Sequence, residues 1–278
     1  MRPFLLLTFF VLLNACADPY GKYKNPPEHI TQASAANAGY YEAYDATLEL
    51  WNVPFEELYI PTTNGIAHVI VSGPKNAEAV VLLHGMNASS TMWYPNIEAL
   101  AKNHRVFAID FILEPGKSHL NNDIESVDKV TAWYKEVLFA LELDSFHLIG
   151  ASRGGWLAVT LALNDQTKIK SLILLSPAQT FTWIKPSTDL LKNIVRIFSS
   201  KEKQIAQSLE SMSSNVANIN EAYLKQYKLG MELESENKFV TSMKPFSNSE
   251  LKSLQMPVLV LIGDDDMINE RRTVEIAN

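Results

Sequence analysis

Short apolar runs alternate with amphipathic stretches through the middle of the chain. Apolar runs occupy 80–83, 106–109, 146–149, 172–175 and 257–262, and His147 is the one polar residue among them. Apolar residues at helical spacing occupy 92–102, 127–143 and 155–163, and recur at 247–254 and 269–277. Fully apolar strands that alternate with helices are typical of a parallel sheet covered on both faces. The pattern therefore predicts an α/β fold.

The start of this region follows a different pattern. Residues 40–51 carry apolar side chains at helical spacing, and short β-branched runs follow at 57–60 and 66–71. The two runs are joined by Thr62-Thr63-Asn64-Gly65, and an Asn-Gly pair between such runs favours a hairpin. We expect an N-terminal antiparallel hairpin beside the parallel strands.

The alternation stops near residue 180. Residues 181–246 are rich in helical patterns and contain no good strand, so we expect a helical insertion there. It divides the core into a first part, 38–180, and a second part, 247–278. Residues 17–37, with three prolines and several alanines and serines, are typical of a linker.

The composition is that of an ordinary globular protein. Of 278 residues, 47% are hydrophobic and 20% charged, and the net charge is −7. An acidic chain with no basic stripe argues against nucleic acid as a partner. No window reaches the roughly 18 apolar residues that a membrane span requires.

The first residues predict export. Arg2 precedes an apolar run, 4–13, that is too short to span a membrane and suits a secretory signal. The run ends in Leu-Asn-Ala-Cys16, which resembles the lipobox of bacterial lipoproteins and implies a signal peptide over 1–16 and a membrane anchor at Cys16. Cleavage after Ala17 would instead release a soluble secreted protein. Cys16 is the sole cysteine, so neither form has a disulfide.

The segment Gly150-Ala-Ser152-Arg-Gly154 lies between a predicted strand and a predicted helix. A strand that turns sharply into a helix needs small neighbours around the turn residue. Gly150 and Gly154 supply them, so Ser152 can hold a strained backbone with its hydroxyl clear of the sheet. We interpret Ser152 as a nucleophile, the alternative being an ordinary strand–helix turn.

Backbone donors for an oxyanion are expected from two places. The strand at 80–83 ends in His84-Gly85, and a glycine there lets the next backbone N–H groups turn toward a ligand. The N–H of Met86 is one candidate donor, and the N–H of Arg153, directly after the nucleophile, is the other. A plain strand-to-loop turn is the alternative for His84 and Gly85.

Carboxylates follow the last predicted strand. Gly263 and three aspartates, 264–266, come directly after 257–262, and the carboxyl end of a strand is where ligands bind in such folds. The spacing does not match an EF-hand, so we expect no metal.

The order of these motifs resembles the α/β-hydrolase superfamily, nearest its carboxylesterase and meta-cleavage hydrolase branch. The matching features are His84-Gly85, the turn around Ser152, the helical insertion and Gly263-x-x-Asp266. The resemblance implies a lid at 181–246, Ser152 as nucleophile and Asp266 as the acid of a triad. It also implies a small apolar ester as substrate and no cofactor.

The sequence departs from this family at the base. The family places a histidine after the acid, in the order Ser, Asp, His, but none occurs among the twelve residues after Asp266. His119 is the one substitute on the catalytic side, and a solvent-facing loop histidine is the alternative reading. The family's last strand and helix are also missing, which leaves 257–262 as an apolar edge. We expect a C-terminally shortened version of a longer hydrolase.

These observations predict a serine hydrolase, most simply a carboxylesterase that works through an acyl-enzyme on Ser152. A hydrolase of carbon–carbon bonds in ring-cleavage products would use the same residues. A binding lipoprotein that keeps the fold without the chemistry is the third possibility, because the base is not found.

Overall fold

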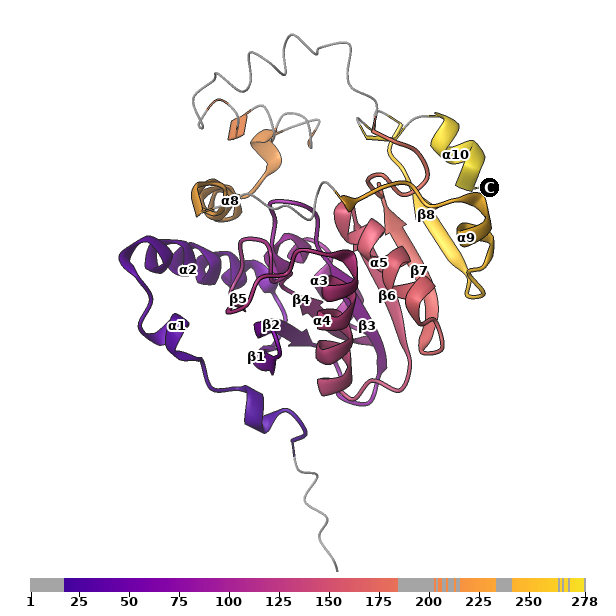
Figure 1. The fold of residues 1–278 in the computed structure, drawn as a ribbon. Coiled ribbons are helices and arrows are strands. Elements are labelled where there is room, and N and C mark those ends of the chain that lie inside the picture. Colours follow the sequence, from indigo (N-terminus) through magenta and orange to yellow (C-terminus); the bar gives the residue numbers. More distant parts are fainter. Residues whose placement is uncertain are drawn as a thin grey trace, which may run out of the picture.

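A computed structural model describes residues 18–184, 216–233, 242–264 and 271–277, together with 203, 205, 206, 209, 213, 266, 268 and 269. Its centre is an eight-stranded sheet in the order β1-β2-β4-β3-β6-β7-β8, with β5 paired to β2 (Figure 1). The strands are β1 Phe55–Thr62, β2 Gly65–Ser72, β3 Glu78–Leu83, β4 His104–Ile109, β5 His119–Leu120, β6 Phe146–Ala151, β7 Ile169–Leu175 and β8 Val258–Leu261.

The sheet is mostly parallel, with an antiparallel hairpin at one edge. β1 pairs with β2 from Phe55↔Ser72 to Thr62↔Gly65, which leaves a two-residue turn. β2 runs antiparallel to β4, whereas β4, β3, β6, β7 and β8 are parallel neighbours. The predicted α/β sheet with its N-terminal hairpin is therefore confirmed. The short strand β5 was not expected from the sequence.

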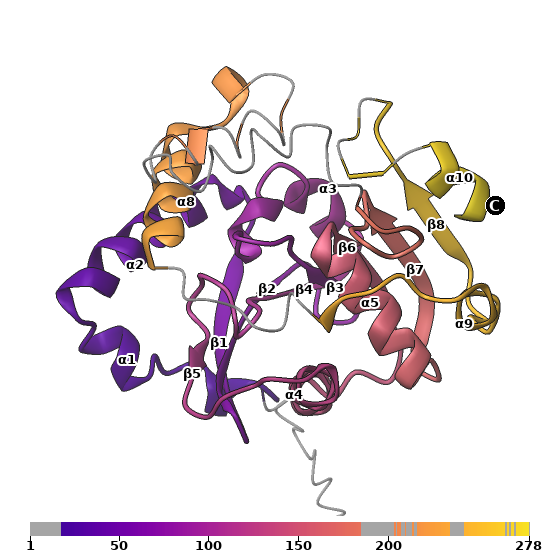
Figure 2. The same ribbon diagram turned by 45° about the horizontal axis from the view of Figure 1, so that its top comes forward.

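Helices cover both faces of the sheet (Figure 2). On one face, Trp133 and Val137 of α4 and Leu157 of α5 pack on the strands in one core cluster. On the other, Tyr44 of α2 and Ile97 of α3 belong to a second cluster. The described helices are α1 Glu28–Thr31, α2 Ala35–Leu48, α3 Ile97–Ala101, α4 Val127–Ala140, α5 Arg153–Asn164, α8 Glu221–Leu233, α9 Asn248–Lys252 and α10 Arg271–Ala277.

The region 92–102, expected as one helix, is divided in two. A 3-10 helix, η3 Ser90–Trp93, precedes α3, which begins at Ile97. Pro95 lies between them. A proline has no N–H to donate, and its ring clashes with the carbonyl four residues earlier, so the helical hydrogen-bond pattern is interrupted there.

The described part of the expected linker, 18–37, packs on the core rather than forming a free tether. Tyr20 donates a hydrogen bond to the carbonyl of Leu141 at 2.8 Å, and its ring lies edge-on to Phe107. The ammonium of Lys24 lies 2.7 Å from the carboxylate of Glu56. The prolines in this stretch favoured the prediction of a linker. Its aromatic side chains, however, have apolar surface that is buried when they pack on the core.

Some predicted segments fall partly or wholly outside the described residues. The signal peptide with Cys16 does so entirely. Of the expected lid, 181–246, the structure describes 181–184, 216–233 and 242–246, with isolated positions between 203 and 213. Among the described helices, none is long and apolar enough to cross a bilayer.

Candidate active site

Ser152 lies at the turn between β6 and α5 in a strained conformation. Its backbone has φ 51° and ψ −117°, a region that residues with a side chain rarely occupy. Backbone hydrogen bonds hold it there. The Ser152 amide donates to Leu175 at 2.8 Å, and its carbonyl accepts from Gly155 and Ala178 at 3.0 Å each. The strain therefore persists because hydrogen bonds to β7, to the start of α5 and to the segment after β7 fix the backbone of this residue.

The two glycines around Ser152 are required by space. A Cβ on Gly150 would lie 2.2 Å from the carbonyl oxygen of Gly154. A Cβ on Gly154 would lie 2.2 Å from the oxygen of Leu83 and 2.6 Å from that of His84. The start of α5 thus lies directly against the end of β3, and a larger residue at either position would push them apart.

This contact brings the loop after β3 beside Ser152. A Cβ on Gly85 would lie 3.5 Å from the Cβ of Ser152. Within the described residues, the backbone amides of Met86 and Arg153 form no hydrogen bond. The structure therefore brings the predicted nucleophile and both predicted donor residues together, and leaves two N–H groups free near the serine.

His84 holds this loop and is not available for proton transfer. Its Nε2 accepts a hydrogen bond from the amide of Phe111 at 2.8 Å, so the ring proton is on Nδ1, which donates to the carbonyl of Gly85 at 2.8 Å. Burial lowers the pKa of His84, which keeps the ring neutral. Both ring nitrogens are thus used to fix the backbone beside Ser152.

Asp266 lies at the same edge of the sheet. Its Oδ1 accepts from the amides of Ile268 and Asn269 at 2.8 and 2.7 Å. Burial alone would raise the pKa of Asp266, but the hydroxyl of Ser176 and these two amides outweigh it and hold the pKa below its ordinary value. β6 and β8 are separated by β7, so Asp266 follows a strand that lies roughly 10 Å from the one before Ser152. Asp264, by contrast, is exposed.

The remaining histidines lie away from Ser152. His119 is in β5 and stacks on His29 with ring centroids 4.4 Å apart. Because β5 pairs with β2, at least two strand spacings, roughly 10 Å, separate it from β6. His104 and His147 are near the amino ends of β4 and β6, at the opposite edge. The structure therefore does not bring His119, the predicted substitute base, to the serine.

His68 belongs to a buried charged cluster that the sequence analysis did not identify. Its Nδ1 and Nε2 lie 2.9 Å from carboxylates of Asp110 and Glu57. Burial alone would lower the pKa of His68, but the two carboxylates outweigh it and raise the pKa. Lys117 Nζ also bonds Glu57, at 2.6 Å. Asp110 reaches the loop after β3, because its Oδ1 accepts from the amide of Ser90 at 2.7 Å.

The loop after β4 supplies further residues that the sequence analysis missed. Asp110, Glu114 and Lys117 all follow this strand at the carboxyl edge and are buried. The signal was present, since charged residues that follow an apolar strand at this edge are candidates for a site.

Comparisons with known proteins agree with this geometry. Residues 78–208 match a family model described as the alpha/beta hydrolase fold. The carboxylesterase YbfK of Bacillus subtilis is 31% identical over 258 residues, which cover 89% of this chain and 85% of that protein. The crystal structure of naproxen esterase from Bacillus subtilis superposes with a TM-score of 0.80 at 31% identity, covering 88% of this chain and 86% of the other.

A more distant structure shows the fold alone. A meta-cleavage product hydrolase from Pseudomonas fluorescens is 20% identical, with a TM-score of 0.63 over 79% of this chain and 84% of that one. One conclusion follows from the strand order, from the strained serine between β6 and α5, and from the two relatives that match this chain over most of their length. The chain belongs to the α/β-hydrolase family, as its motifs indicated.

Proposed function

We propose that this protein hydrolyses carboxylic esters through an acyl-enzyme on Ser152. The observation that carries the proposal is a strained, half-buried serine with the free amides of Met86 and Arg153 beside it. Ser152 attacks the ester carbonyl, and the two amides stabilise the negative charge that develops on its oxygen. The ester class is supported by the carboxylesterase and the naproxen esterase among the relatives.

Asp266 has the properties of the acid in such a mechanism. Its hydrogen bonds keep it ionised, and an anionic carboxylate can orient an imidazole and stabilise its protonated form. The separation of β6 and β8 leaves space for a ring between Asp266 and Ser152. No histidine of the described residues lies there, so an imidazole from another source would have to take the proton of Ser152 and return it to the leaving alcohol before water releases the acid.

Ester turnover by the 278-residue chain tests the proposal. With imidazole added as an external base, we expect hydrolysis of p-nitrophenyl butyrate that is lost in Ser152→Ala. Ser171→Ala is the matched control, because Ser171 bonds His147 at the opposite edge of the sheet and should leave turnover unchanged.

The role of the base is tested in the same assay. Adding imidazole supplies an external base, and a saturable acceleration that disappears in Ser152→Ala would place that base next to the serine. A fluorophosphonate probe reports the serine independently. Turnover and labelling that are both insensitive to Ser152→Ala, with or without imidazole, would contradict the proposal and favour a binding protein.

A further inference from the structure

One carboxylate lies between the two halves of the candidate oxyanion site. Oε2 of Glu114 accepts a hydrogen bond from the backbone amide of Asn87 at 2.6 Å. Its Oε1 forms an ion pair with Nη1 of Arg153. Asn87 directly follows Met86, and Arg153 carries the second donor. Glu114 therefore contacts the neighbour of one free amide and the side chain of the residue that carries the other.

This bridge is part of the protein interior. The side chains of Arg153 and Glu114 are 1% and 2% exposed. The guanidinium lies over the ring of Phe111 at 5.0 Å, and the amide of Glu114 donates to the carbonyl of Phe111 at 3.0 Å. The cost of desolvating both charges offsets much of their attraction, so this buried pair is weak evidence for a gain in stability.

The backbone around Met86 is held on both flanks. The carbonyl of Gly85, which shares a peptide plane with the Met86 amide, accepts from His84. The next amide, that of Asn87, donates to Glu114. Asn87 also has a φ of 58°, in the left-handed region, and such a conformation persists where its surroundings fix it. Rotation of the peptide that presents the Met86 N–H would therefore break one of these two bonds.

We propose that Glu114 is a positioning residue that sets the spacing and direction of the two oxyanion donors. It does so by tying the loop after β3 to the start of α5. The inference deepens the proposed function and rests on it. Oxyanion donors act by being fixed before the charge develops. A loosened bridge should therefore reduce the stabilisation of the transition state more than it reduces substrate binding.

The first test is Glu114→Gln, which keeps the volume but leaves one carbonyl oxygen to replace two carboxylate oxygens. We expect kcat for p-nitrophenyl butyrate to fall by about 10-fold or more, while KM changes by less than about 3-fold. Glu136→Gln is the matched control. Glu136 also accepts a backbone amide, that of Thr63 at 2.7 Å, but it lies on α4 away from Ser152.

A second variant separates positioning from stability. Glu114→Met combined with Arg153→Met removes both charges together and keeps the Arg153 backbone amide. Replacing a buried ion pair by apolar side chains is often neutral for stability, so Tm should stay within a few degrees of wild type. Because the Asn87 amide no longer has the Glu114 carboxylate as its acceptor, kcat should still be about 10-fold lower than in wild type. Recovery of kcat together with Tm would show a purely structural role and overturn the inference.

Hydrogen exchange tests the bridge without relying on turnover. The amides in a peptide covering 84–93 should exchange faster in Glu114→Gln than in wild type or Glu136→Gln. Unchanged exchange would overturn the inference whatever the rates of hydrolysis. If wild type shows no Ser152-dependent turnover, the proposed function fails, and faster exchange would still support the bridge as the device that fixes this loop.

Discussion

Replacing Gly154 by alanine tests the contact on which the site depends. Gly154 is the second residue of α5, where alanine would ordinarily favour the helix by about 1 kcal/mol. The new Cβ, however, would lie 2.2 Å from the oxygen of Leu83, whereas ordinary contacts begin at 3.4 Å. Either the start of α5 or the end of β3 must therefore move by about 1 Å.

Both sides of that contact belong to the site. The start of α5 carries Ser152 and Arg153, and the end of β3 leads directly to Gly85 and Met86. A misplacement of about 1 Å in a catalytic constellation costs on the order of 100-fold in rate. Overpacking should also cost roughly 1–3 kcal/mol, which lowers Tm by about 2–4 °C for each kcal/mol in a chain of this size.

The assay compares kcat and Tm of Gly154→Ala with those of wild type and Gly39→Ala. Gly39 lies inside α2, and a Cβ there meets nothing within 4 Å. Gly39→Ala should leave kcat unchanged and stabilise the protein by up to about 1 kcal/mol. A Gly154→Ala protein that keeps both kcat and Tm would refute the reasoning, because it would show that α5 and β3 can separate without disturbing the serine.

Two further predictions concern the buried cluster around His68. His68→Gln leaves the carboxylates of Asp110 and Glu57 without their imidazolium, and should lower the free energy of unfolding in urea by about 3–5 kcal/mol. In wild type, the pKa of Glu57 is lowered to about 2, so its stabilisation is present above roughly pH 4.5 and is lost as pH falls toward 2. The raised pKa of His68 gives stabilisation that is complete below about pH 6.5 and is lost as pH rises through the folded-state pKa. Calorimetry across pH should show the alkaline loss in wild type and not in His68→Gln; equal profiles would contradict a charged His68.

The sequence predicted those parts of the molecule that depend on neighbouring residues. The strands and helices follow from apolar periodicity, and the turn at Ser152 follows from two small residues around one position. The cap of α9 was also predictable, since Ser247 and Glu250 form a capping box within four residues. In each case the interacting groups are close along the chain, so the local pattern contains the required information.

The missed features join residues that are far apart along the chain. Glu114 and Arg153 are 39 residues apart, and His68 and Asp110 are 42 apart. Each of these residues alone is compatible with a solvated surface position, where charged side chains are usually found. Only the sheet order, which places β2 next to β4 and the loop after β4 near β3, brings them together in the interior.

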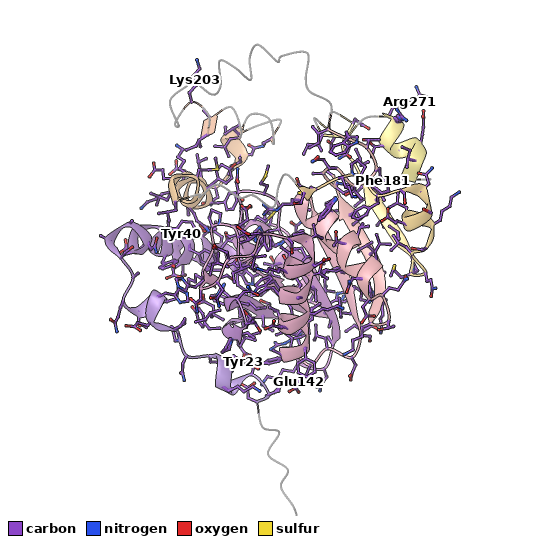
Figure 3. The ribbon with its side chains drawn as sticks, in the orientation of Figure 1. Tyr23, Tyr40, Glu142, Phe181, Lys203 and Arg271 are labelled. Atoms are coloured by element: carbon purple, nitrogen blue, oxygen red, sulfur yellow. The ribbon has the colours of Figure 1, made fainter. Side chains whose placement is uncertain are left out.

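The loop after β3 also connects the candidate site to α8, which lies in the region expected as a lid. Gln226 of α8, 2% exposed, donates to Ser89 and accepts from Thr91, each at 2.9 Å. Its amide also reaches the hydroxyl of Tyr40, which lies on α2 next to α8 (Figure 3). The segment that presents the Met86 amide is thus held by core residues at one end and by α8 at the other. A displacement of α8 would therefore be transmitted toward the Met86 amide through Ser89 and Thr91.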